Sequence, residues 1–480
     1  MYLDGRSRLR LGAASNRLCR WLAVLFPATL VGSVSGQSYL APPPGFQGAP
    51  AVPSMGNVTP ASGANNGQFS SQTLNQIDQQ ANGTPESNGQ ATPTTEGGKE
   101  ATATAPLAAP FDAMASWGAV HVHPHASYQF LYATGIHNQP GSEADSFTHT
   151  VSPGVSVVLG PHVSMDYTPS FRFYSEKDFH DTVDHSFDFH AGYNVGDWML
   201  GLSQTFAITD QPMVETSSQV KQQTYQTGLL ASYNMSDKAT LATTASMRIE
   251  STSGAGTTNI FVGGTNGAAA QLTDSQDYDV AENFDYKFNE KLSGGLSASF
   301  GYTDQAGGFR SLNESFSLHV GWRPTSKLSA VVSGGFEQQS FLDSKSSSAW
   351  NPVYSATIGY QMFEHTALSL FANRSSQASI FSGQLSQNTS LGVNLQQRLL
   401  EKMQLSLGFG YNQVDFQSTS TADLSTSRSD ESTSFTAGLV VPFLTRCSFS
   451  AFYQYTQNSS SEKGFSYDSS QVGATLSWSY

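Results

Sequence analysis

The stretch Gln471-Val-Gly-Ala-Thr-Leu-Ser-Trp-Ser-Tyr480 decides the fold class of this chain. Its apolar residues occupy alternate positions from Val472 to Tyr480, and polar residues and Gly473 fill the positions between them. A period of two predicts a β-strand with one apolar and one polar face. Such a strand must pair with others or lie exposed at the edge of a sheet, so its partners are expected elsewhere in the chain.

The same alternation recurs from Trp117 onward and predicts about 18 strands, with a range of 16–18. The first half holds Val122–Tyr132, Phe147–Leu159, Val163–Phe173, Val183–Tyr193, Trp198–Ile208, Tyr225–Met235, Leu241–Ile249, Tyr278–Phe288 and Leu292–Tyr302. The second half holds Leu312–Trp322, Leu328–Phe336, Tyr354–Met362, Leu368–Ala372, Leu391–Leu399, Leu405–Tyr411, Phe435–Phe443, Phe449–Tyr455 and Val472–Tyr480.

The connections between these strands are predicted to alternate in length. Every second one is tight, as at Gly160-Pro161 and Ser236–Lys238. The connections between them are predicted to be long and polar: Asp210–Gln223, Ser251–Gln276, Ser340–Asn351, Ser375–Asn388 and Gln417–Ser432. Short periplasmic turns that alternate with long external loops are typical of a transmembrane β-barrel. A closed barrel also satisfies every strand edge, which lipid cannot do.

The terminal stretch is similar to the closing strand and assembly signal of bacterial outer-membrane barrels. The residues that carry this similarity are Gln471, Gly473, Leu476, Trp478 and Tyr480. From about Trp117 to Tyr480 the chain resembles the β-barrel porin group of Gram-negative outer-membrane proteins. We therefore expect an all-β fold, a transmembrane antiparallel up-and-down β-barrel preceded by a disordered N-terminal segment. We expect this barrel in the cell outer membrane, in contact with its lipids and with the barrel-assembly machinery.

Three segments are predicted from the composition. Residues 1–36 combine arginines with the short apolar run Trp21–Val31 and small residues, which is typical of a signal peptide. Residues 37–114 are rich in Pro, Gly, Gln, Asn, Thr, Ser and Ala and predict a disordered periplasmic tether. This tether is either a plain spacer or an arm that meets peptidoglycan or a periplasmic partner. Residues 115–480 form the barrel.

Charge and cysteine content exclude several classes of protein. The net charge of −14 disfavours nucleic acid as a partner, because a phosphate backbone requires a basic surface. Removal of the signal peptide leaves Cys447 as the one cysteine, so no intramolecular disulfide is expected. No run of 18 apolar residues is present that would predict a membrane-spanning helix.

The polar face of the predicted strands supplies candidate pore-lining residues. They are His121, His123, His125, His162, Asp166, Arg172, Asp184, Asp188, His190, Asp277, Asp279, Asp285, Lys287 and Arg398. The histidines are candidates for a metal site or for a change of pore charge near pH 6–7. The alternative is a hydrated wall in which water satisfies each imidazole. Acidic residues dominate the earlier half, which favours a mild preference for cations.

No residue is predicted to perform chemistry. The sequence contains no Gly-x-Ser-x-Gly, Walker, Gly-x-Gly-x-x-Gly or His-Glu-x-x-His motif, so we expect neither an enzyme nor a cofactor. The predicted function is a porin-like channel for diffusion or export of small solutes or polysaccharide. The loop Ser251–Gln276 either folds inward as a constriction or stays external and mobile. The alternative function is a non-conducting barrel that acts as a surface adhesin or scaffold through its long loops.

Overall fold

A computed structural model describes most of the predicted barrel. The described residues are 115–139, 142–177, 179–213, 218–254, 274–305, 309–342, 349–378, 384–400, 402–418, 428–461 and 466–480. The predicted signal peptide and the whole of the predicted tether lie outside these ranges, as does most of the loop Ser251–Gln276. Among the described residues no helix is long and apolar enough to cross a membrane.

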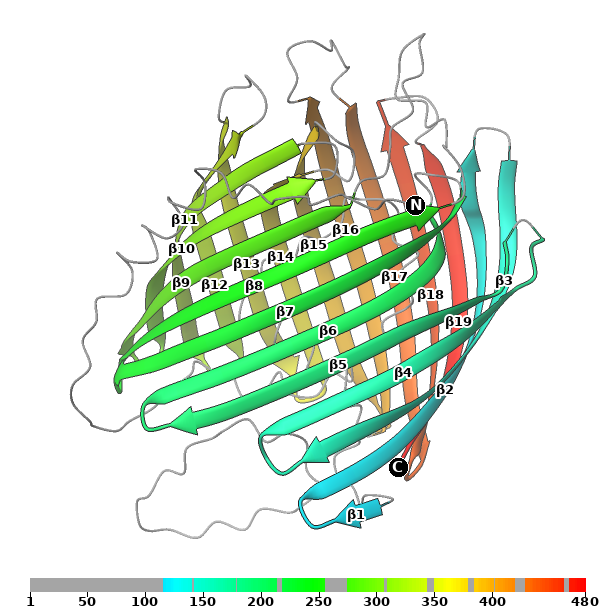
Figure 1. Cartoon of the computed structure of the whole chain (residues 1–480), viewed down its shortest axis with the longest axis horizontal. Coiled ribbons are helices and arrows are strands. Elements are labelled where there is room, and N and C mark those ends of the chain that lie inside the picture. The colour runs from blue at the N-terminus through cyan, green and yellow to red at the C-terminus, as the bar shows by residue number, and fades with distance from the viewer. Residues whose placement is uncertain are drawn as a thin grey trace, which may run out of the picture. The chain divides into compact units, whose positions relative to one another are not determined.

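The described chain consists of β-strands and the turns between them (Figure 1). The strands of the first half are β1 (Ala115–Trp117), β2 (Val120–Gln139), β3 (Ser142–Leu159), β4 (Val163–Tyr174), β5 (Thr182–Val195), β6 (Trp198–Met213), β7 (Ser218–Ser236), β8 (Ala239–Gly254), β9 (Ser275–Asn289) and β10 (Leu292–Gln305). Those of the second half are β11 (Phe309–Thr325), β12 (Leu328–Phe341), β13 (Ala349–Phe363), β14 (Thr366–Ala378), β15 (Gln384–Leu399), β16 (Met403–Ser418), β17 (Arg428–Leu444), β18 (Cys447–Ser460) and β19 (Tyr467–Ser479).

The strands form one closed antiparallel barrel. Each of β2 to β18 pairs with the next strand along the chain, and β19 pairs back to β2, so the wall has 18 strands. The strands are strongly tilted, and β2 and β19 lie side by side in Figure 1. The strand number and the up-and-down topology predicted from the alternation are therefore confirmed.

The seam between β19 and β2 closes the barrel. In its register Trp478 lies opposite Ala126 and Ser479 opposite His125. The strand β19 does not reach the first residues of β2, and the short strand β1 pairs there instead, with Trp117 opposite Val120. Gly118 forms the β1–β2 turn at φ 64, a left-handed conformation that glycine adopts without strain. Strand β1 thus covers an edge of β2 that would otherwise lie unpaired.

The two faces of the wall differ as the alternation predicts. The outward face carries exposed apolar residues, including Tyr193, Trp198 and Trp322 near the tight turns and Phe147 and Phe336 near the opposite end. Aromatic rings at both borders of an apolar band are the expected arrangement where a barrel meets the lipid headgroups. The inward face is mainly Ser, Thr, Gly, Gln and Asn.

The long connections are shorter than the sequence predicted, because the strands extend into them. The strand β6 continues to Met213 and β7 begins at Ser218, so most of Asp210–Gln223 belongs to strands. The connections at 140–141 and 306–308 are as short as the tight turns. The prediction was wrong here because it ended strands where apolar residues end. A polar segment beyond the lipid band stays in the strand, since the ladder still pairs its backbone groups.

Candidate pore lining

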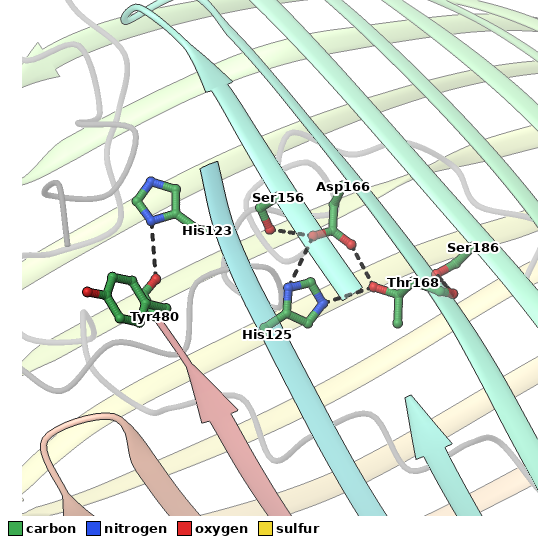
Figure 2. A network of polar contacts seen from close by, with 7 residues as sticks. All are labelled: His123, His125, Ser156, Asp166, Thr168, Ser186 and Tyr480. Atoms are coloured by element: carbon green, nitrogen blue, oxygen red, sulfur yellow. Dashed lines mark hydrogen bonds and ion pairs between the residues drawn. The ribbon is translucent and has the colours of Figure 1, made fainter. Parts of the chain in front are cut away.

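A polar network on the inward face joins β2, β3, β4 and β5 near the tight-turn end (Figure 2). Nε2 of His125 lies 3.0 Å from Oγ1 of Thr168, and Nδ1 lies 3.7 Å from Oδ2 of Asp166. The hydroxyl of Thr168 donates to Oδ1 of Asp166 at 2.8 Å, and Ser156 donates to Oδ2 of Asp166. Ser186 donates to the backbone oxygen of Thr168 at 3.2 Å. The network places a histidine beside a carboxylate in the wall.

Proton placement in this network argues against a hydrolytic triad. The hydroxyl proton of Thr168 is committed to Asp166, so His125 donates its Nε2 proton to Thr168 rather than accepting one. A general base must accept the proton of the nucleophile, and here the direction is reversed. At 3.7 Å the other nitrogen of His125 interacts with Asp166 as an ion pair when the ring is protonated, not as a hydrogen bond.

Gly154 makes room for the ring of His125. A Cβ atom at Gly154 would lie 2.1 Å from Nε2 of His125 and 2.6 Å from Oγ1 of Thr168. Both distances are shorter than any normal contact, so a side chain at this position would displace the histidine. The glycine on β3 therefore sets the position of the imidazole of β2 against β4.

The predicted histidine group does not converge on one point. His123 instead bonds to the backbone oxygen of Tyr480 at 3.2 Å, on the other side of β2 from Asp166 (Figure 2). His162 lies in the β3–β4 turn, where Nδ1 approaches the backbone oxygen of Gly192 at 3.1 Å and the ring lies 4.9 Å from that of Tyr193. In the described ranges no three His, Cys, Asp or Glu side chains gather closely enough to hold a metal ion.

Other candidate residues form polar contacts between strands. Arg172 on β4 pairs with Asp184 on β5 at 3.0 Å, and both side chains are nearly buried. Across the intervening strand β10, Nε2 of His319 on β11 lies 2.7 Å from Oδ1 of Asp285 on β9, within hydrogen-bonding distance. The Arg172–Asp184 pair neutralises part of the inward charge that the sequence supplies.

The remaining candidates are placed singly along the inward face. Asp188 lies directly opposite Asp166 in the β4–β5 register, and His190 lies opposite Ser164. Asp277 accepts hydrogen bonds from Thr303 at 2.7 Å and Ser275 at 3.4 Å. The other four candidates lie in paired parts of their strands: His121 on β2, Asp279 and Lys287 on β9, and Arg398 on β15.

Several inward charged residues were missed by the sequence prediction. They are Arg248 and Glu250 on β8, His319 on β11, Glu337 on β12, and Arg428 and Asp430 on β17. Arg428 pairs with Asp430 at 3.0 Å and lies 4.0 Å from the ring centroid of Phe416. Most stand at or beyond the end of an apolar run, where the prediction ended the strand. Extending the inward parity past that point would have found them.

The predicted assembly residues lie on both faces of β19. Leu476, Trp478 and Tyr480 carry the outward parity, whereas Gln471 and Gly473 face inward, and Gln471 is 5% exposed. The guanidinium of Arg446 lies 3.4 Å from the ring centroid of Tyr480. The backbone N–H of Tyr480 donates to the backbone oxygen of Pro124 at 3.0 Å, which ties the end of β19 to β2.

A closed barrel with a polar inner face, an apolar outer face and tight turns at one end defines a porin-like outer-membrane β-barrel. Comparison with known families agrees. Residues 303–480 match the family model described as "Putative beta-barrel porin 2", and the chain resembles this family as the sequence predicted. The protein is thus located in the outer membrane of a Gram-negative cell. By the usual orientation, its tight-turn end faces the periplasm.

Solved barrels show only distant likeness. OpdO of Pseudomonas aeruginosa is 12% identical, with 75% of this chain and 97% of that chain covered and a TM-score of 0.42. OccK2 of the same organism, solved in complex with glucuronate, is 11% identical, with 75% and 98% covered and a TM-score of 0.45. OccAB3 of Acinetobacter baumannii is 9% identical, with 75% and 99% covered and a TM-score of 0.44. No curated protein matches the chain.

Proposed function

We propose that the barrel is a passive channel through which small solutes or polysaccharide cross the outer membrane. The polar inner face of the 18-strand wall carries this proposal. Side chains fill the interior of a barrel of about eight strands, whereas barrels of about 16–18 strands leave an aqueous channel. A wall of hydroxyl and amide groups offers hydrogen bonds to hydrated solutes.

The inward charges are proposed to set a mild preference for cations. Asp166, Asp188, Asp277 and Asp279 have no ion pair with a Lys or Arg side chain within the described strands, although His125 stands 3.7 Å from Asp166. Rings of carboxylates in a pore wall attract cations and repel anions.

The channel proposal is tested by conductance of the refolded full chain in a planar lipid bilayer. We expect stepwise current increases in potassium chloride, with size proportional to salt concentration, as for a water-filled pore. A protein that inserts, as shown by a heat-dependent shift on a gel, but passes no current would overturn the proposal.

One observation favours the second candidate, a non-conducting surface adhesin or scaffold. Inward side chains near the end opposite the tight turns are buried, including Ser146 and Ser386 at 0%, Ser311 at 2% and Gln339 at 3%. A lumen packed at that end would block diffusion. Absence of current together with binding of intact cells to a surface or to one another would support this alternative.

The partners are also proposals. Outer-membrane lipids are the partner of the apolar band, and the barrel-assembly machinery is the partner of the terminal strand. Residues 37–114 are proposed to reach peptidoglycan or a periplasmic protein. Co-sedimentation of the full chain with purified peptidoglycan, compared with a chain lacking these residues, tests the last proposal.

A further inference from the structure

A patch of buried polar side chains lies on the inward face of β11, β12 and β13, at the end opposite the tight turns. Glu337 and Gln339 stand two positions apart on β12, so they share this face. Asn313 on β11 is directly opposite Gln339, and Asn351 on β13 is directly opposite Glu337. Side chains in such neighbouring positions lie about 5–8 Å apart at their Cβ atoms, within reach of one small ligand.

The patch contains hydrogen-bonding atoms that have no partner. Oε1 of Glu337, Oε1 of Gln339 and Oδ1 of Asn313 are buried and accept no hydrogen bond, although the Glu337 carboxylate also accepts hydrogen bonds from the side chain of Asn313 and the backbone N–H of Ser376. Glu337 is 2% exposed and Gln339 is 3% exposed. Buried polar atoms are almost always paired, because an unpaired one loses its hydration without compensation. Three unpaired oxygens on adjacent positions therefore indicate a missing ligand.

Charge identifies the class of this ligand. Glu337 forms no ion pair in the part of the chain that the structure describes, unlike Asp184 and Asp430, which pair with arginines. A bound cation stabilises a buried carboxylate in its charged form, and amide oxygens complete the shell of a cation. The unpaired Nδ2 of Asn351 turns into a fourth oxygen if its amide is rotated by half a turn, an exchange of similar atoms.

We propose that Asn313, Glu337, Gln339 and Asn351 form a cation-binding site in the outer half of the lumen. This inference rests on the proposed channel function and deepens it, since a bound cation at this point determines which ions pass. The shared chemistry is a positive charge surrounded by carboxylate and amide oxygens. The occupant is either an inorganic cation or an organic ammonium ion, and the experiment separates the two.

The test is the reversal potential of the full chain in a planar bilayer across a potassium chloride gradient. We expect Glu337→Gln to lower the cation-to-anion permeability ratio about two- to tenfold, the range expected for loss of one charge near the ion path. The matched control is Glu314→Gln. Glu314 neighbours Asn313 on β11 but takes the outward parity, so its loss is expected to leave the ratio unchanged.

A second measurement identifies the occupant. Millimolar calcium chloride or a diamine such as 1,4-diaminobutane is added to the channel, and block of the potassium current is recorded. Block by calcium alone indicates a metal site, and block by the diamine alone indicates an ammonium site. In either case Glu337→Gln is expected to remove the block, and Glu314→Gln is expected to retain it.

Outcomes that contradict the site are distinct from those that contradict the channel. Substitution of a buried carboxylate that forms no ion pair by its amide, which keeps an oxygen to accept hydrogen bonds, is expected to leave folding intact, and the heat-dependent gel shift checks this. If Glu337→Gln conducts with wild-type selectivity and block, the site is refuted and the channel stands. If the wild-type chain passes no current, the channel proposal itself fails. Should Glu337→Gln not fold, Gln339→Leu takes its place, with the same loss of block expected.

Discussion

The close packing of Phe452 against Gly473 makes a quantitative prediction about the terminal strand. Phe452 on β18 lies directly opposite Gly473 on β19, and both face inward. The ring covers the glycine and is only 6% exposed. A Cβ atom at Gly473 would lie 2.2 and 2.3 Å from two ring carbons of Phe452. Ordinary contacts begin near 3.4 Å, so an added methyl group must displace the ring by more than 1 Å.

We therefore expect Gly473→Ala to destabilise the folded barrel by about 1–3 kcal/mol, the usual cost of overpacking a filled site. Phe452→Ala is expected to cost about 3–5 kcal/mol, because it removes a buried ring. In the Phe452→Ala background the added methyl has no ring to meet. The double variant is thus expected to be no less stable than Phe452→Ala alone, giving a coupling energy of about 1–3 kcal/mol.

The assay is equilibrium unfolding by urea of the barrel in detergent micelles or lipid vesicles, followed by tryptophan fluorescence and by the gel shift. Gly334→Ala is the matched control, since a Cβ at that strand glycine meets nothing within 4 Å. The reasoning is refuted if Gly473→Ala is as stable as Gly334→Ala. It is equally refuted if the cost of Gly473→Ala is the same with and without the ring.

A further prediction concerns the seam. Arg446→Ala is expected to lower unfolding stability by about 0.5–1 kcal/mol, because the guanidinium lies on the ring of Tyr480. Lys402→Ala, at another tight turn, should cost less, and equal effects in urea unfolding would contradict the seam contact.

The sequence alone determined the architecture of this protein. The alternation in Val472–Tyr480 and its recurrence fixed the strand period, the number of strands and the identity of the lipid-facing residues. This was possible because a barrel wall has lipid on one side and water on the other, so residues along each strand are alternately apolar and polar. The closing pair of β19 with β2 followed from the same reasoning, since lipid leaves no edge strand unpaired.

Tertiary structure decided which residues of the lumen meet. His125, Asp166 and Thr168 come from two strands, and only the β2–β3–β4 register brings them together. The same holds for the patch around Glu337, which lies one residue beyond the apolar run ending at Phe336. Alternation specifies the face of a residue but not its neighbour across the strand. That neighbour depends on the stagger of the strands, which the closed barrel sets as a whole.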